Sequence, residues 1–161
     1  MLPAYAYLTI LLICWAYALF KGGAPERIGA SVIGLGSVLS LVAASASGIR
    51  FGAVEVGVFL VDVTAFAVFV ALALRAERHW PLWVAALQAI GTAGHAAKLV
   101  DPAVIPVAYA FVLAFWVYPM LLLIVMGTWQ HQRRLARFGV DKSWSSSSGR
   151  SEPQPRSGPI V

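Results

Sequence analysis

Five long apolar runs constrain the fold of this chain more than any other feature of its sequence. They cover approximately residues 3–20, 28–47, 53–74, 81–100 and 103–127. A helix needs about 20 apolar residues, at a rise of about 1.5 Å per residue, to cross the hydrocarbon of a bilayer. The connections between the runs are short, so consecutive helices are expected to be antiparallel neighbours. The sequence therefore predicts an all-α, up-and-down bundle of five transmembrane helices.

The composition excludes a water-soluble domain. Hydrophobic residues make up 60% of the chain and charged residues only 12%, too few to build a polar surface around the apolar runs. The single cysteine, Cys14, lies within the first run and has no second cysteine with which to form a disulfide or a redox pair. We interpret the first run as a retained span, because no Lys or Arg precedes it to form the charged start of a signal peptide.

The fourth run is the least apolar, since it contains Gln88, His95 and Lys98. The distribution of Lys and Arg indicates that it crosses the membrane, because these residues accumulate in short cytoplasmic loops and flanks. With five spans, ten basic residues lie on one side and two on the other; without the fourth run the division is seven against five. We therefore expect the N-terminus outside and the C-terminus in the cytoplasm.

Boundary residues refine this prediction. Asp101 and Pro102 offer an N-cap and a first-turn proline for the fifth helix, and Pro119 is expected to kink that helix. Aromatic side chains prefer the interfaces of a membrane. This preference places Trp80, Trp83 and Trp129 at the cytoplasmic interface, and Tyr5 and Tyr7 at the outer one.

The composition changes sharply after Gly127. Residues 128–140 form a basic juxtamembrane segment, in which Arg133, Arg134 and Arg137 either contact anionic lipids or serve only as a stop-transfer anchor. Residues 141–161 are rich in Ser, Pro and Gly and predict a disordered tail. Because the positive charge belongs mostly to this region, the basic character of the chain does not indicate nucleic-acid binding.

Small residues recur at four-residue intervals in the second run, a spacing that lets helix backbones approach closely in lipid. We expect this face either to place the second helix at the centre of the bundle or to form a dimer. The residues are Ala30, Gly34, Gly36, Ser40 and Ala44.

Two polar faces match in register between the third and fourth helices. Glu55 and Asp62 are two turns apart on the third helix, and Gln88, His95 and Lys98 share one face of the fourth. In antiparallel helices, facing residues have a constant sum of residue numbers, and both Glu55 with His95 and Asp62 with Gln88 add up to 150. The register pairs Glu55 with His95 and Lys98, and Asp62 with Gln88. Asp62 is then left without a cation at its depth, so we expect it to be neutral at pH 7 or to titrate near it.

These polar faces support two hypotheses about function. They either form a hydrogen-bonded link between two helices of a structural, interaction or accessory subunit, or line a path for protons or small cations in a minimal transporter or channel. The leading prediction is the subunit, as a homo-oligomer or part of a larger membrane complex in a bilayer with anionic lipids. The sequence contains no catalytic motif, no second intramembrane histidine for a haem and no metal-binding pattern, so we expect no enzyme activity, cofactor or metal. A third hypothesis, a membrane enzyme, requires Glu55, His95, Lys98 and Asp101 to face the outer side together.

The segments "HWPLWVAALQ", "HAAKLVDPA" and "AFWVYPM" resemble small multi-pass membrane proteins of proteobacteria, notably of sphingomonad relatives. The resemblance covers about residues 78–137. It implies a bacterial inner membrane as the location of the chain. No activity is known for that group, so it implies no functional residues.

Overall fold

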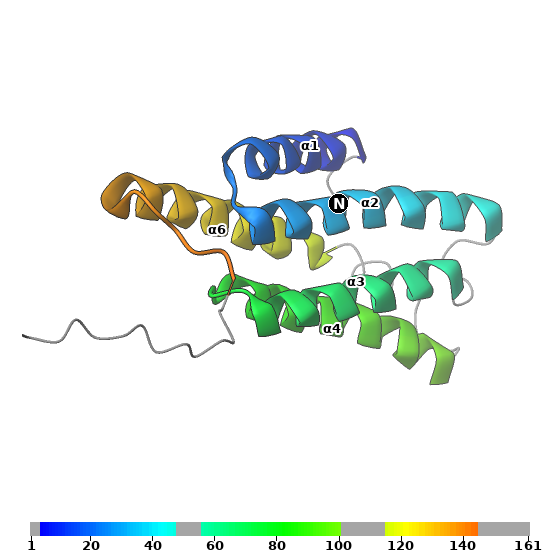
Figure 1. Cartoon of the computed structure of the whole chain (residues 1–161). Coiled ribbons are helices and arrows are strands. Elements are labelled where there is room, and N and C mark those ends of the chain that lie inside the picture. The colour runs from blue at the N-terminus through cyan, green and yellow to red at the C-terminus, as the bar shows by residue number, and fades with distance from the viewer. Residues whose placement is uncertain (1–3, 48–55, 101–114, 145–161) are drawn as a thin grey trace, which may run out of the picture.

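The computed structural model describes residues 4–47, 56–100 and 115–144, and these residues form an all-helical bundle, as predicted. The helices are labelled in Figure 1. They are α1 (Ala4–Lys21), α2 (Ala24–Ser47), α3 (Val56–Arg75), α4 (Trp80–Val100) and α6 (Val117–Phe138). The described residues contain no β-strand, only an isolated antiparallel bridge between Ala76 and Trp144.

Two of the described helices are long and apolar enough to cross a membrane, namely α2 over Ala24–Ala43 and α3 over its whole length. This composition indicates association with a membrane. The polar residues of α4 and the basic C-terminal residues of α6 lower the hydropathy of these helices. The apolar part of α1 is shorter, at Tyr5–Lys21.

The first four helices begin and end within four residues of the apolar runs, whereas α6 ends eleven residues beyond the fifth run. Most of the segment predicted to be a separate basic stretch, residues 128–140, therefore continues α6. Its Arg, Gln, Leu and Ala residues are favourable in a helix. The helix ends where Gly139 adopts a left-handed conformation, with φ of 72°, and donates its N–H to the carbonyl of Leu135.

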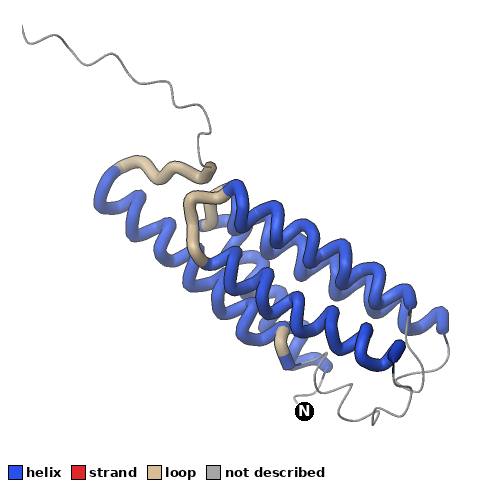
Figure 2. Tube along the Cα trace, turned by 90° about the horizontal axis from the view of Figure 1, so that it is seen from below, coloured by secondary structure: helices blue, strands red, loops and turns tan. Residues whose placement is uncertain are grey.

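The helices lie side by side (Figure 2), with α2 in contact with α1, α3 and α6, and α4 packed on α3 and α6. The α1–α2 and α3–α4 connections lie at one end of the bundle, and the C-terminal end of α6 extends past them (Figure 1). We call this the basic end. The predicted N-cap at Asp101 and Pro102 lies outside the described residues. Pro119 lies in the first turn of α6, where a proline is tolerated because the N–H that it lacks needs no partner there; Phe115 before it is also helical and Trp116 forms a turn. The preceding part of the fifth run lies outside the described residues, so the kink at Pro119 stays a prediction.

Trp80 is the centre of the packing near the basic end. Only 6% of its surface is exposed, so its ring packs inside the bundle rather than facing outward. Its predicted depth, at the membrane interface, stays a prediction. Its ring fills the space beside two glycines: a Cβ added to Gly29 or Gly127 would lie 2.7 or 2.6 Å from the indole. Ile124 of α6 and Val84 of α4 complete this part of the core. Trp83 and Trp129, in contrast, are exposed.

The small residues of α2 face the neighbouring helices. Ala30 is buried, Gly34 lies against the indole of Trp15 on α1, and Gly36 lies against Val61 on α3. Ser40 is half-buried, and the side chain of Ala44 lies outside the described part of the structure. The small-residue face thus supports packing within the bundle through two of its glycines.

Tyr7 is also part of the bundle interior. Its hydroxyl lies 2.6 Å from that of Ser37 on α2, and its ring packs edge-on against Tyr118 of α6 at 6.0 Å between centroids. Tyr5 is exposed. The burial of the two tyrosines does not test their depth in a membrane, so their position at the outer interface stays a prediction.

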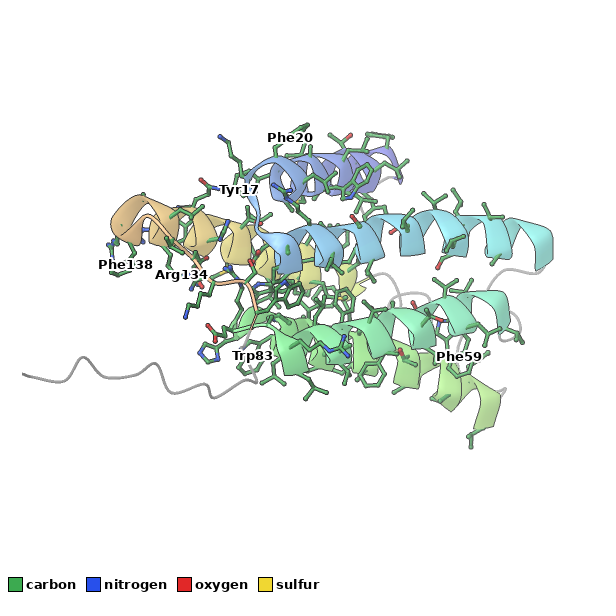
Figure 3. The ribbon with its side chains drawn as sticks, viewed as in Figure 1. Tyr17, Phe20, Phe59, Trp83, Arg134 and Phe138 are labelled. Atoms are coloured by element: carbon green, nitrogen blue, oxygen red, sulfur yellow. The ribbon has the colours of Figure 1, made fainter. Side chains whose placement is uncertain are left out.

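Large apolar side chains project outward from every described helix. Phe20, for example, points away from the bundle in Figure 3 and is 81% exposed. The set includes Leu8, Leu12 and Ile13 of α1, Leu35, Leu39 and Val42 of α2, Leu60 of α3, Leu82 and Ile90 of α4, and Leu122 and Met126 of α6.

Candidate functional site

A group of polar side chains joins α3 to α4. Gln88 Nε2 donates to Asp62 Oδ1 at 3.1 Å, which is the contact predicted from the helix register, and lies 3.4 Å from the backbone carbonyl of Asp62. His95 Nε2 lies 3.0 Å from Asp62 Oδ2. Both carboxylate oxygens of Asp62 therefore have a partner on α4. We call these three residues the Asp62 group.

Burial differs across the Asp62 group. His95 is completely buried, and the ring of Phe59, labelled in Figure 3, packs against its imidazole at 5.7 Å between centroids. The side chain of Asp62 retains 25% of its surface. The imidazole is thus held in place by the helices while the carboxylate keeps an open edge.

The prediction that Asp62 lacks a possible cation is wrong, because His95 reaches it. Matching of residue numbers compares Cα positions, but side chains lean toward the N-terminus of their own helix. In antiparallel α3 and α4 this inclination moves Asp62 and His95 toward each other. Glu55, the predicted partner of His95, lies outside the described residues, and Lys98 is buried near the far end of α4.

A second group, which the sequence reasoning missed, lies at the basic end. Glu26 in the first turn of α2 is completely buried, and its Oε1 accepts a hydrogen bond of 2.9 Å from Trp80 Nε1. Arg78 Nη1 lies 3.3 Å from the same oxygen. Oε2 of Glu26 is buried and has no hydrogen-bond partner within the described ranges.

Arg78 extends this group to the segment that follows α6. Its Nη2 donates to Asp141 Oδ2 at 2.8 Å, and His131 Nδ1 lies 2.5 Å from that oxygen. Arg134 Nε lies 3.0 Å from the other carboxylate oxygen of Asp141. We call Glu26, Arg78, His131, Arg134 and Asp141 the basic-end cluster; it ties α2, the α3–α4 connection and α6 together.

The charges around Asp141 alter its acidity. Burial by itself raises the pKa of this carboxyl, but hydrogen bonds from His131 and Arg78 and the charges of Arg78 and Arg134 outweigh burial. The pKa of Asp141 therefore lies below the ordinary value of 3.8. Asp141 is ionised at neutral pH.

Residues 141–144 lie against the bundle, so the predicted disorder of the tail is wrong for these four residues; residues 145–161 lie outside the described residues. Asp141 enters the basic-end cluster, and Trp144 forms a backbone bridge to Ala76 after α3. Composition alone suggested a tail from residue 141 onward. The sequence offers one indication that these acids pair with basic residues. The chain contains only seven acids, and Glu26 and Asp141 both lie next to a basic residue in the sequence.

The arginines predicted to contact lipid have different surroundings. Arg134 is half-buried and engages Asp141, whereas Arg133 and Arg137 are exposed on α6. The guanidinium of Arg133 lies over the indole of Trp129, 4.5 Å from the ring centroid. Only Arg133 and Arg137 are therefore directed away from the protein's own carboxylates.

Neither polar group has the side chains of a metal site. In the parts of the chain that the structure describes, no three His, Cys, Asp or Glu side chains come together to hold an ion. The Asp62 group joins a carboxylate on α3 to an imidazole and an amide on α4. The basic-end cluster pairs two acids with two arginines and a histidine.

Comparisons with known proteins found no matching family model, no similar curated protein and no similar solved structure.

Proposed function

We propose that the chain is a five-span protein of a bacterial inner membrane, with its N-terminus outside and its C-terminus in the cytoplasm. Outward-facing apolar side chains on every described helix support insertion into lipid. Gln88, His95 and Lys98 lower the hydropathy of α4, but all three are buried, so they do not oppose its crossing. The resemblance to proteobacterial membrane proteins agrees with this location.

The charges support the orientation. Among the described Lys and Arg residues, all except Lys98 lie at the basic end of the bundle. Basic residues accumulate on the cytoplasmic side of inner-membrane proteins. The basic end is accordingly the cytoplasmic end in this proposal.

Within that membrane, the chain acts as a structural or interaction subunit. One observation carries this proposal: Asp62 directs both carboxylate oxygens to side chains of α4, so the polar site between α3 and α4 is occupied by helix-to-helix contacts. Such contacts hold helices in a defined arrangement, typically with a contribution of about 1 kcal/mol each in a membrane. A rigid bundle with apolar outer surfaces is suited to binding another membrane protein or a second copy.

Photo-cross-linking in native membranes tests the subunit proposal. A photoreactive residue at Leu39, which is 55% exposed on α2, is expected to give a discrete cross-linked product. The same residue at Ile33, which is 6% exposed on the same helix, is the matched control and is expected to give none. If Leu39 and the exposed positions of α1 all give no discrete product, the chain does not act as a subunit.

A second function, a minimal transporter or channel for protons or cations, is favoured by one feature of the Asp62 group. The carboxylate keeps an open edge while the histidine that contacts it is buried. Titratable groups in this arrangement are what a relay requires. The path would comprise Glu55, Asp62, Gln88, His95 and Lys98.

Flux measurements distinguish the two functions. Wild-type protein and Asp62→Asn are reconstituted in proteoliposomes and exposed to a pH gradient. A structural role predicts no proton or monovalent-cation flux from either protein and a lower thermal midpoint for Asp62→Asn. Flux in the wild type that Asp62→Asn removes, with the variant still folded, would instead establish the conduction path.

A further inference from the structure

The exposed side of α6 changes from apolar to basic along a single stripe. Leu122, Met126, Trp129, Arg133 and Arg137 are all exposed, and their spacing of three or four residues places them on one helix face. At about 1.5 Å per residue, the two apolar side chains and the tryptophan span about 10 Å, and Arg133 lies about 6 Å further. This sequence of side chains matches the acyl chain, interface and headgroup levels of a phospholipid.

The basic part of the stripe forms a shallow open groove. Its lining is contributed by Trp129, Gln130, Arg133, Arg134, Arg137 and Phe138. Phe138 is 74% exposed and lies at the end of the helix that extends beyond the rest of the bundle (Figures 1 and 3). No Asp or Glu occurs between Met126 and Val140, so the surface carries positive charge without an acid beside it in the sequence.

Neighbouring contacts position the arginines unequally. Stacking on Trp129 restrains the guanidinium of Arg133, which lowers the entropy lost when it binds a ligand. Arg134 is directed to Asp141 and anchors the groove to the basic-end cluster. Arg133 and Arg137, one turn apart, are left as the pair that can bind a phosphate through bidentate hydrogen bonds.

We propose that this stripe binds an anionic phospholipid of the cytoplasmic leaflet. Arg133 and Arg137 hold the headgroup phosphate, Gln130 donates a further hydrogen bond, and an acyl chain lies along Trp129, Met126 and Leu122. The inference rests on the proposed membrane insertion and orientation. It goes beyond a stop-transfer role, because an orientation signal needs positive charge but neither a groove nor a stacked guanidinium.

Native mass spectrometry of protein released from bilayers of phosphatidylcholine with a minor share of phosphatidylglycerol tests the site. Wild type is expected to retain phosphatidylglycerol preferentially, and Arg133→Gln with Arg137→Gln to retain at least tenfold less. Lys21→Gln with Lys142→Gln is the matched control, since it removes two exposed positive charges at the same end of the bundle; its retention should stay within about twofold of wild type. Arg133→Lys with Arg137→Lys keeps the charge but loses the guanidinium geometry and should give an intermediate value.

Two results would overturn the lipid site. One is that the Arg133→Gln, Arg137→Gln protein retains as much phosphatidylglycerol as wild type. The other is that the Lys21→Gln, Lys142→Gln control loses as much, which would show an effect of net charge alone.

Extraction of the same membranes with alkaline carbonate tests insertion separately. Release of wild-type protein by carbonate would contradict the membrane-spanning proposal. Protein that stays inserted but shows no lipid preference would contradict only the site.

Discussion

Glu26 and Arg78 illustrate how individual charges are accommodated in this chain. Both side chains are almost entirely buried, and removing a charge from water is costly unless it has a counter-charge and hydrogen bonds. Trp80 donates to Glu26, and Asp141 accepts from Arg78, so each charge has a second contact beyond the pair itself. Loss of one partner leaves the other charge buried and less well compensated.

We therefore expect Glu26→Gln and Arg78→Gln each to lower the free energy of unfolding by about 2–4 kcal/mol. The double variant should be less destabilised than the sum of the two, with a coupling of about 1 kcal/mol or more. Thermal or denaturant unfolding in detergent measures these differences. Glu77→Gln is the control, because this acid is exposed at the same end. Additive single effects would show that the two buried charges do not stabilise each other.

Asp141 links stability to pH. Because its pKa in the folded protein lies below the ordinary value of 3.8, its ionised form stabilises the fold at pH values above that value. This contribution disappears as the pH falls through the lowered pKa. Asp141→Asn should thus unfold at a lower temperature than wild type at pH 7, and the difference should narrow below about pH 4. A difference between the two proteins that is the same at pH 7 and pH 3 would contradict the role of this carboxylate.

At the scale of the helices, close approach around Trp80 holds α2, α4 and α6 together. Gly29 of α2 and Gly127 of α6 leave room for the indole of Trp80 on α4, and neither site has space for a methyl group. Gly91 of α4 differs, since nothing lies within 4 Å of the position that a Cβ would occupy there. Close packing against Trp80 therefore requires glycine at positions 29 and 127 but not at position 91, although all three lie inside helices.

Gly127→Ala should destabilise the bundle by about 1–3 kcal/mol, because the added methyl group forces Trp80 or α6 to shift. Gly91→Ala is the matched substitution and should be neutral or stabilising by up to about 1 kcal/mol, since alanine is favoured over glycine in a helix. Unfolding midpoints of the two variants measure the contrast. Equal effects at both sites would show that the indole does not limit the approach of α6.

At the scale of the whole molecule, the number of spans decides where the chain's ends lie. If all five described helices cross, the N-terminus and the end of α4 are outside. If only α2 and α3 cross, both of these positions are in the cytoplasm together with the end of α6. The two arrangements thus differ at defined points in the chain.

Reporter fusions distinguish them. A fluorescent protein that folds only in the cytoplasm, attached after residue 144, should fluoresce in either arrangement. Attached after Val100, it should be dark if five helices cross and bright if only two do; alkaline phosphatase at the same position should show the opposite pattern. Fluorescence after Val100 would reject the five-span proposal.

Much of the bundle follows from local sequence patterns. Runs of apolar residues determined where α1 to α4 lie, because backbone hydrogen bonds within a helix and burial of apolar side chains depend on residues close together in the chain. The pairing of Asp62 with Gln88 was also predicted, since antiparallel helices joined by a short connection have a register that residue numbers reveal. The end of α6 was missed, because apolarity marks membrane spans and not the full length of a helix.

The tertiary structure alone decided which polar groups meet. His95 reaches Asp62 through the inclination of two side chains, and Glu26 meets Arg78 although 52 positions separate them. Asp141 reaches Arg78 only because α6 continues to Phe138 and the chain then changes direction at Gly139. The sequence determined the helices, their order and the end of the bundle that carries the basic residues. The contacts between charges depend on how helices tilt, rotate and extend against each other, and distant parts of the chain contribute to each of them.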